Sequence, residues 1–378
     1  MARIVHCLNK ISKVGLATLP KGYELSEELN EKVDAILVRS AAMHEMELPS
    51  SVKCVARAGA GVNNIPLEEY AKKGIVVFNT PGANANAVKE LTIAMMLLAA
   101  RDIRGSMEWV NANKEDPEIN KTMEKAKSAY AGTEIYGKTL GVIGCGAIGA
   151  LVADAASKLG MKVLGVEPSE KVRERYKDLL SQVEFVNNEE LYKRSDYITI
   201  HVPLMDATKG MLNEKAFAQM KDEVIIINAA RDALVNDNDL EVALKSDKVR
   251  KYVTDFPNAK TANMDGVVAI SHLGASTEEA EDNCAVMAVN EIVQFIENGN
   301  LINSVTYPAL DLGTKNGTRV VVLYNAEEQN AEKLLEELKP CGLNKFASGV
   351  KGRFGALLAE VNKAPEKDLN AIKTIIIK

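Results

Sequence analysis

The sequence has few aromatic residues, few histidines and no closely spaced pair of cysteines. Aromatic side chains make up 5% of the 378 residues, and there are one Trp and four His. The five cysteines are scattered and none forms a C-x-x-C pair, so neither a disulfide framework nor a zinc site is indicated. We therefore expect a protein of the reducing cytoplasm that holds no metal ion.

Long apolar runs and an excess of basic charge are also missing. The longest apolar stretch, near residues 91–100, is too short to cross a bilayer, and no apolar signal region precedes the strand-like residues 3–7. The net charge is −6, with Lys and Arg interspersed among acids, which argues against a nucleic-acid scaffold. The sequence thus predicts a soluble protein that binds neither membranes nor nucleic acids and whose partners are small molecules.

A glycine-rich segment in the middle of the chain has the features of a dinucleotide-binding fingerprint. It follows a predicted buried strand over residues 139–143 and precedes a predicted helix over residues 150–159. Its first glycine permits the tight turn, the second lets the backbone approach a pyrophosphate, and the third lets helix pack closely on strand. The helix N-terminus offers N–H groups to the anion. The residues expected to bind the cofactor here are Gly144, Gly146, Ala147, Ile148 and Gly149.

Glu167 ends the next predicted strand, over residues 161–166, where an acid should bind the adenosine ribose diol. A carboxylate there accepts a hydrogen bond from a 2′-hydroxyl and repels a 2′-phosphate, so the predicted cofactor is NAD rather than NADP. Lys171, Arg173 and Arg175 lie just downstream and could hold a phosphate. Their spacing on a charged helix favours a solvated face instead.

The mid-chain position of the fingerprint predicts a split first domain. The length indicates two or three domains, and residues 1 to about 100 alternate strand-like and helical segments, as in an α/β unit. A long helical segment over residues 278–298 could return the chain to that unit. We expect an α/β fold with two Rossmann-like or flavodoxin-like domains: a substrate-binding domain over residues 1–102 and 283–310, and an inserted NAD-binding Rossmann domain over residues 103–282.

The tail predicts a small third domain over residues 318–378, after a linker near residues 311–317. The predicted order is βαββαβ, the ferredoxin-like order. The elements are a strand over 319–324, a helix over 326–338, strands over 345–350 and 354–361, a helix over 366–371 and a strand over 374–377.

A hydride-transferring enzyme needs a group that exchanges a proton with the substrate oxygen and a cation that holds the substrate. His201 and His272 both end predicted strands, where ligands of open α/β sheets bind, so either could be the acid/base. Arg231 also follows a strand, and its guanidinium could hold a carboxylate and the neighbouring carbonyl. The alternative for Arg231 is a surface salt bridge to Asp232 or Asp237.

Taken in order, these segments resemble the D-isomer-specific 2-hydroxyacid dehydrogenase family, most closely its phosphoglycerate dehydrogenases. The resemblance covers about residues 1–308, and the ordered set is far more specific than any single motif. The matching segments are residues 38–40, 59–64, 79–82, 88–90, 144–149, 201–204, 228–231 and 272–277.

The resemblance implies roles for individual residues. His272 would be the acid/base, and Arg231 the substrate clamp. The residues implied to line the cofactor are His201, Val202, Pro203, Ala229, Arg231, Asp255, His272 and Gly274. Gly61 and Val62 would offer backbone N–H groups to the substrate carboxylate. Arg39 and Ser40 would face the far end of the substrate, where an arginine suits a phosphate.

Two departures from the family pattern leave alternatives open. The family usually pairs the catalytic histidine with a Glu in an Asp-Val-Phe-x-x-Glu segment, but here Ala259 or Lys260 stands at that position. Asp255 could substitute, an acid from elsewhere could substitute, or His272 could work unpaired. The tail resembles the ACT domain that binds amino acids, but it lacks the Pro-Gly turn after its first strand. It would be either a site for an effector such as serine or a packing or oligomerisation module.

The function implied by the resemblance is NAD-dependent oxidoreduction of a phosphorylated 2-hydroxy acid. The reaction would interconvert 3-phosphoglycerate and 3-phosphohydroxypyruvate in serine biosynthesis, carried out by a cytoplasmic homo-oligomer that is at least a dimer through the Rossmann unit. One alternative is a dehydrogenase or reductase of another D-2-hydroxy acid. Another is an NAD-sensing corepressor that binds peptides.

Overall fold

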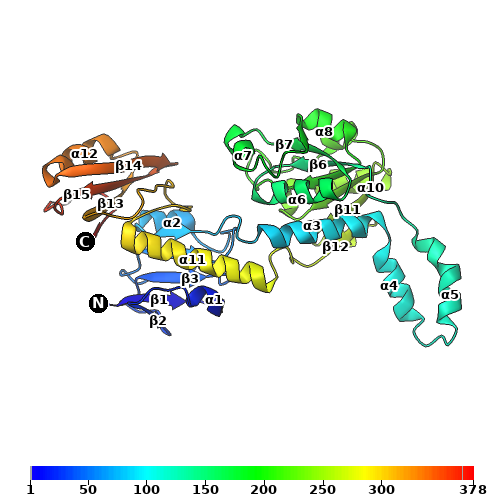
Figure 1. The fold of residues 1–378 in the computed structure, drawn as a ribbon, viewed down its shortest axis with the longest axis horizontal. Helices are drawn as coiled ribbons and strands as arrows, with labels where there is room; N and C mark the ends of the chain where they lie inside the picture. Colours follow the sequence, from blue (N-terminus) through cyan, green and yellow to red (C-terminus); the bar gives the residue numbers. More distant parts are fainter. Residues whose placement is uncertain (1, 368) are drawn as a thin grey trace. The chain divides into compact units, whose positions relative to one another are not determined.

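The structure is a computed structural model that describes residues 2–367 and 369–378 (Figure 1). Its internal contacts divide the chain into two compact units. Unit 1 comprises Met1–Asn84 and Glu278–Lys378, and unit 2 comprises Ala85–Thr277. The predicted boundaries at residues 102 and 282 differ from these ends. The division of unit 1 into a substrate-binding domain and a separate tail domain stays a prediction.

Unit 1 contains a parallel sheet of order β2-β1-β3-β4-β5. Its strands are β1 (Arg3–Cys7), β2 (Tyr23–Ser26), β3 (Ala35–Val38), β4 (Cys54–Arg57) and β5 (Val76–Phe78), and its helices are α1 (Lys13–Leu16), α2 (Leu67–Lys72) and α11 (Glu278–Asn298). Side chains of β3 and β4 alternate between two buried apolar clusters, one on each face. Helix α11 covers one of these faces and has the predicted bounds. Both covered faces explain why β3 and β4 are almost entirely apolar.

The tail of unit 1 forms an antiparallel four-stranded sheet of order β14-β15-β13-β16. Its elements are β13 (Thr318–Asn325), α12 (Ala331–Leu338), the 3₁₀ turn η4 (Lys339–Cys341), β14 (Leu343–Lys351), β15 (Phe354–Val361) and β16 (Lys373–Ile377). The four predicted strands and the first predicted helix are therefore confirmed. The small antiparallel sheet itself does not identify an ACT domain.

The predicted second helix of the tail, over residues 366–371, is wrong for the residues that the structure describes. Asp368 lies outside them, and the residues on either side of it are in bends or without regular structure. Pro365 precedes the segment, and Asn370 adopts a φ of +46°, which a helix does not allow. The expected βαββαβ order is thus replaced by four strands with one α-helix.

The two faces of this small sheet pack on different parts of unit 1. Alternate residues such as Val320 and Val322 contact Leu334 and Leu338 of α12. The other face joins the cluster that includes α11 and the first parallel sheet. The tail therefore shares a hydrophobic core with the rest of unit 1.

Unit 2 is built on a parallel sheet of order β12-β11-β10-β9-β6-β7-β8. Its strands are β6 (Thr139–Ile143), β7 (Lys162–Val166), β8 (Val183–Phe185), β9 (Tyr197–Ile200), β10 (Val224–Asn228), β11 (Val249–Thr254) and β12 (Val267–Ala269). The chain runs outward from β6 through β7 to β8 and returns to β9 on the other side of β6. This reversal is the switch point of a doubly wound fold, where ligands bind. The predicted α/β fold with Rossmann-like parallel sheets is confirmed.

Helices surround this second sheet and also extend away from it (Figure 1). They are α3 (Ala85–Ala100), α4 (Ile103–Ala112), α5 (Ile119–Ala126), α6 (Ala147–Lys158), α7 (Glu170–Arg175), α8 (Asn188–Arg194), α9 (Glu214–Gln219) and α10 (Asp237–Lys245), with 3₁₀ turns η1 (Lys127–Tyr130), η2 (Asp232–Leu234) and η3 (Thr261–Asn263). Helix α3 packs on α6, β10 and β11. Helices α4 and α5 have no buried residue, and we call them the α4–α5 arm.

The cysteines are free thiols, and all except Cys7 are buried. Cys54 and Cys284 lie in the core of unit 1, Cys341 lies under α12 in the tail, and Cys145 lies in unit 2. Within residues 2–367 and 369–378, no helix is both long and apolar enough to cross a bilayer. In the same residues, no three His, Cys, Asp or Glu side chains are grouped so that they could hold a metal ion.

Candidate active site

The fingerprint glycines differ in their surroundings as their expected roles require. Gly144 has a φ of +88°, and a Cβ there would lie 2.8 Å from the His201 carbonyl oxygen. A Cβ on Gly146 would meet no heavy atom within 4 Å, so this position faces open space. A Cβ on Gly149 would lie 1.9 Å from the Gly144 carbonyl oxygen. The tight turn at Gly144, the open space at Gly146 and the close packing at Gly149 therefore fit a pyrophosphate-binding loop. This loop leads into α6, whose first residues are Ala147 and Ile148.

Glu167 follows β7 and lies against the fingerprint loop. Its Oε2 accepts a hydrogen bond from the Cys145 backbone N–H at 3.2 Å, and its Oε1 accepts one from the Ser169 N–H at 3.0 Å. These bonds hold the carboxylate at the end of β7, beside the pyrophosphate-binding loop. That is the position from which an acid reaches an adenosine ribose diol.

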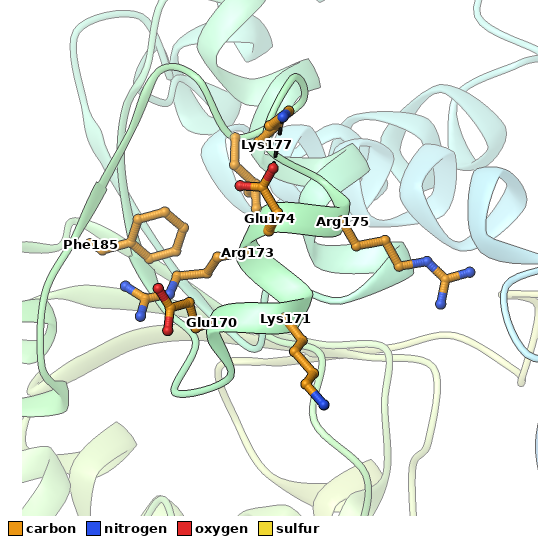
Figure 2. A pocket seen from close by; sticks show the side chains of 8 residues that line it. Glu170, Lys171, Arg173, Glu174, Arg175, Lys177 and Phe185 are labelled. Carbon is orange, nitrogen blue, oxygen red and sulfur yellow. Dashed lines mark hydrogen bonds and ion pairs between the residues drawn. The ribbon is translucent and has the colours of Figure 1, made fainter. Parts of the chain in front are cut away.

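The basic residues of α7 do not form a phosphate site. A hollow of about 830 Å³ surrounds this helix, and Figure 2 shows that the three cations project in different directions. Arg173 lies over the Phe185 ring, with Cζ 5.3 Å from the ring centroid, whereas Lys171 and Arg175 point away from it. Because the cations diverge, the geometry agrees with the solvated-face interpretation and with NAD as the cofactor.

His201 lies next to the fingerprint, at the carboxyl end of β9. Its Nε2 is 2.9 Å from Thr199 Oγ1, and its Nδ1 is buried without a hydrogen-bond partner in the residues that the structure describes. Burial lowers the pKa of His201 to about 4. A site that disfavours the imidazolium form makes a poor acid/base, because the ring must take up and release a proton in each catalytic cycle. Of the two histidines considered, the chemistry therefore favours His272 as the acid/base.

Asn228 shapes the turn that carries Arg231, and the sequence did not single it out. Its Nδ2 donates to the Arg231 carbonyl oxygen at 2.8 Å and to Tyr252 Oη at 3.0 Å, while its Oδ1 accepts from the Ala230 N–H at 3.0 Å. Ala229, inside this turn, is buried. An Asn at the end of an apolar strand, three residues before a candidate Arg, was the available sequence signal.

Arg231 and His272 both contact the ring of Phe256, another residue that the sequence analysis missed. The Arg231 Cζ lies 5.0 Å from the Phe256 ring centroid, and the His272 and Phe256 centroids are 4.2 Å apart. No ion pair joins Arg231 to Asp232 or Asp237 among the described residues, which argues against the salt-bridge alternative. The strand ends of β10, β11 and β12 thus bring the candidate clamp and the candidate acid/base to one aromatic ring.

Asp255 holds the loop of His272 rather than its ring. The Asp255 Oδ2 accepts from the Gly274 backbone N–H at 2.9 Å, and its Oδ1 has no partner in the described structure. Burial raises the pKa of the Asp255 carboxyl, against the opposing effects of the Gly274 N–H and the His272 imidazole. Among the described residues no hydrogen bond joins Asp255 to the His272 imidazole, so Asp255 can act on His272 only through its charge and through the position of the loop.

The segment that usually carries the partner glutamate is turned toward α10. Lys260 Nζ lies 3.0 Å from Glu241 Oε2, and Asn258 Nδ2 donates to Asp237 Oδ2 at 2.8 Å. Both contacts hold this segment against α10. Neither Ala259 nor Lys260 supplies an acid to His272.

The substrate-binding candidates of unit 1 lie at the carboxyl ends of β3 and β4. Arg39 follows β3, and its Nη2 lies 2.7 Å from Glu281 Oε1. Ser40 Oγ accepts weakly from Asn9 Nδ2 at 3.4 Å. Arg57, the last residue of β4, pairs with Val38 in the sheet register. Two arginines on adjacent strand ends therefore belong to the same edge of the sheet.

Arg57 was missed by the sequence analysis, although it lies two residues before the glycine loop of residues 59–62. A Cβ on Gly59 would lie 2.1 Å from Arg57 Nη1, so this glycine leaves room for the guanidinium. Arg57 Nε also donates to Asn64 Oδ1 at 3.2 Å. Gly61 and Val62 follow in the same loop. An arginine at the end of a strand, just before a Gly-x-Gly turn, was the signal that could have identified it.

Comparison with known proteins gives one family throughout. Residues 93–274 match the family described as D-isomer specific 2-hydroxyacid dehydrogenase, NAD binding domain. The chain is 37% identical over 273 residues to a hydroxypyruvate reductase of Thermotoga maritima, which covers 69% of this chain and 84% of the relative. It is 33% identical over 324 residues to a D-3-phosphoglycerate dehydrogenase of Methanocaldococcus jannaschii, which covers 82% of this chain and 59% of the relative.

A solved structure of NAD⁺-bound 3-phosphoglycerate dehydrogenase from Entamoeba histolytica is similar with a TM-score of 0.62 at 25% identity, covering 81% of this chain and 99% of that one. This chain thus spans less than two thirds of the Methanocaldococcus relative but most of the Thermotoga one. The matched domain and the geometry of the pyrophosphate-binding loop together make NAD the cofactor. The chain belongs to the D-isomer specific 2-hydroxyacid dehydrogenase family, a family of NAD-dependent oxidoreductases.

Proposed function

We propose that this protein interconverts 3-phosphoglycerate and 3-phosphohydroxypyruvate with NAD, at the entry to serine biosynthesis. Two relatives named D-3-phosphoglycerate dehydrogenase are 33% and 36% identical to it. The observation that carries the phosphate assignment is the pair Arg39 and Arg57 on adjacent strand ends. Guanidinium groups match phosphate oxygens with paired hydrogen bonds.

The residues of both units have distinct roles in this reaction. NAD, when bound by the fingerprint and Glu167, supplies the hydride acceptor, or in its reduced form the donor. His272 exchanges the proton of the substrate hydroxyl, with its ring oriented against Phe256. Arg231 holds the substrate carboxylate and polarises the neighbouring carbonyl. In unit 1, the backbone N–H groups of Gly61 and Val62 are donors for a substrate carboxylate.

Six further residues surround the reacting end of the cofactor in this proposal. They belong to the carboxyl ends of β9, β10, β11 and β12, or to the loops that follow them. They exclude water and position the nicotinamide ring rather than transfer protons. They are His201, Val202, Pro203, Ala229, Asp255 and Gly274.

Following the absorbance of NADH tests the proposed reaction. Purified protein should oxidise NADH with phosphohydroxypyruvate, with a kcat/KM about tenfold or more above that for hydroxypyruvate. NADPH should be a poor donor, because Glu167 repels a 2′-phosphate. Tight NADH binding without turnover of any 2-oxo acid would instead support an NAD-sensing corepressor that binds peptides.

A reductase of another D-2-hydroxy acid is the second candidate, and the ion pair of Arg39 with Glu281 favours it. A guanidinium that already holds a carboxylate must give it up to bind a phosphate. The variant Arg39→Gln separates the two candidates. A loss of tenfold or more in kcat/KM for phosphohydroxypyruvate alone supports the first candidate, and unchanged values for both substrates support the second.

We propose a cytoplasmic homodimer that associates through unit 2. The α4–α5 arm exposes Ile103, Met107, Val110 and Met123, and apolar helix faces of this kind commonly mark association surfaces. In the tail, both faces of the small sheet are already packed. That packing favours a structural or oligomerisation module over a serine-binding one.

A further inference from the structure

The loop that would bind the substrate carboxylate is fixed by its carbonyl groups. Asn79 Nδ2 donates to the Ala60 carbonyl oxygen at 2.6 Å, and the Thr80 N–H donates to the Gly59 carbonyl oxygen at 3.1 Å. The N–H groups of Gly61 and Val62 take part in no hydrogen bond among the described residues. With its carbonyls held from one side, the loop keeps these donors free for a ligand.

Asn79 is in turn held by the segment of residues 303–306, which runs beside β5. The Asn79 N–H donates to the Asn303 carbonyl oxygen at 3.4 Å, and the Val305 N–H donates to the Val77 carbonyl oxygen at 2.8 Å. Thr306 Oγ1 accepts from the Val77 N–H at 3.0 Å. This segment therefore lies alongside β5 and is also bonded to Asn79, the residue that follows β5 and binds the glycine loop.

Glu291 holds this segment from inside the protein. It lies on α11, is 2% exposed, and its Oε1 accepts from Asn303 Nδ2 at 2.6 Å. Its Oε2 has no side-chain partner among the described residues, and burial raises the pKa of the Glu291 carboxyl. Burying a carboxylate beside one amide is costly. An apolar residue at this position of α11 would stabilise the core more, so packing alone does not explain why an acid is present.

We infer that Glu291 is a positioning residue for substrate binding: through Asn303 and Asn79 it fixes the carbonyls of the glycine loop, so that Gly61 and Val62 present their N–H groups to a carboxylate. This inference rests on the proposed function for the identity of the ligand. A positioned pair of donors binds an anion without first ordering the loop, and preorganisation of this kind strengthens binding. Glu291 itself touches neither substrate nor cofactor.

Two substitutions of Glu291 test the inference. Glu291→Met keeps the size but removes the acceptor for Asn303, and it should raise KM for the 2-oxo acid about tenfold while kcat changes less than about twofold. Glu291→Gln keeps an acceptor oxygen and should restore a KM close to the wild-type value. The affinity for NADH, measured by fluorescence titration, should be the same in all three proteins.

Tyr307→Phe is the matched control. The Tyr307 hydroxyl is also buried in unit 1, but it donates to the Ala71 carbonyl oxygen at 2.5 Å and not toward the glycine loop. This variant should lower the thermal midpoint without raising KM. An equal rise of KM in Tyr307→Phe and Glu291→Met would mean that Glu291 affects KM only through the general stability of unit 1, and it would overturn the inference.

Hydrogen exchange gives a readout that does not depend on the substrate. In Glu291→Met, the hydrogen-bonded amides of Asn79 and Thr80, which connect the glycine loop to the segment of residues 303–306, should exchange at least about tenfold faster than in Tyr307→Phe. Unchanged exchange overturns the positioning role even if the enzyme is active. Faster exchange in a protein that reduces no 2-oxo acid supports the positioning role and rejects the proposed function.

Discussion

At the scale of single residues, buried titratable groups separate the two candidate histidines. His201 ends β9 with one ring nitrogen near Thr199 and the other buried without a partner in the described structure. Its place beside the fingerprint suits a neutral wall of the cofactor site. This assignment leads to a measurable dependence of stability on pH.

We expect His201 to make the fold less stable in acid. The pKa of His201 is about 4 when folded and near 6.5 when unfolded, so between these values the unfolded chain binds more protons. Stability contributed by the neutral ring is complete above about pH 6.5 and is lost as the pH falls, by at most about 1.4 kcal/mol per pH unit. In urea unfolding at pH 7, 6 and 5, His201→Asn should weaken this dependence, whereas exposed His44→Asn should not.

Asp255→Asn should keep the fold and change the pH profile. The amide oxygen can still accept from the Gly274 N–H, and the variant removes a buried carboxylate whose pKa is raised by burial. Because such a carboxyl destabilises the fold as the pH rises past its unfolded pKa, the variant should be at least as stable as wild type at pH 7. An unchanged profile of kcat/KM against pH would remove the Asp255 charge from the mechanism. Asp255→Ala, which also loses the acceptor, should lower both stability and kcat.

At the scale of elements, the α4–α5 arm is the clearest unpaired surface of unit 2. We expect Met107→Glu, at a side chain 62% exposed, to convert the dimer to a monomer in light scattering. A carboxylate in an apolar contact is costly to bury. The control is Val242→Glu on α10, at a side chain 68% exposed, which should leave the dimer intact. Monomeric wild-type protein at micromolar concentration would contradict the proposed role of the arm.

Strands and helices with a strong apolar pattern were predictable, and marginal elements were not. Buried strands such as β6 and β15 have their predicted bounds, because continuous apolar runs require cover on both faces. Strand β2 was missed because two of its four residues are exposed at the sheet edge. The false helix over residues 366–371 had a helical composition, but the chain there bends after Pro365 and through Asn370.

Site residues were predictable where their position after a single strand identifies them. They were not predictable where only contacts between separate segments identify them. Arg231 and His272 follow from their positions after β10 and β12. Phe256, which touches both, depends on packing between separate loops. Asn228 and Arg57 had local signals but needed the sheet register to be recognised as neighbours of the site.

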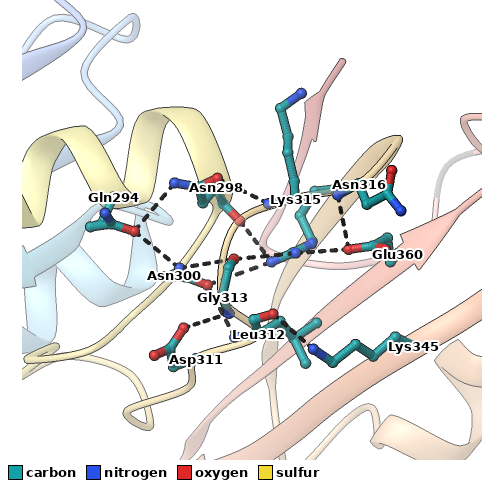
Figure 3. Close-up of polar contacts among 11 residues, drawn as sticks. Gln294, Asn298, Asn300, Asp311, Leu312, Gly313, Lys315, Asn316, Lys345 and Glu360 are labelled. Carbon is teal, nitrogen blue, oxygen red and sulfur yellow. Dashed lines mark hydrogen bonds and ion pairs between the residues drawn. The ribbon is translucent and has the colours of Figure 1, made fainter. Parts of the chain in front are cut away.

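At the scale of the whole molecule, polar contacts fix the tail to the end of α11. Figure 3 shows two of them: the Lys315 N–H donates to Asn298 Oδ1, and the Asn316 N–H donates to Glu360 Oε2. Arg319 is fully buried, and its Nη2 lies 2.9 Å from Glu360 Oε2. Its Nη1 donates to the Asn298 carbonyl oxygen at 2.8 Å, at the last residue of α11. The tail and the first sheet should therefore unfold together.

We expect Arg319→Met to destabilise unit 1 by about 3–5 kcal/mol, because the buried Glu360 carboxylate would lose its ion-pair partner. Arg319→Met combined with Glu360→Leu should recover most of that loss. Urea unfolding followed by fluorescence measures both variants. Arg319→Met as stable as wild type would show that the tail is only loosely joined to α11.

The alkylation rates of the buried thiols report local opening of the folded protein. Cys145 belongs to unit 2, whereas Cys54 and Cys284 belong to unit 1. A buried thiol reacts with an alkylating reagent only when its surroundings open. NAD should slow the alkylation of Cys145, since ligand binding stabilises the unit that holds it. If NAD slows the alkylation of Cys145 but not of Cys54, the two units open independently. Comparing the alkylation rates of the individual cysteines then measures how strongly NAD binding to unit 2 stabilises unit 1.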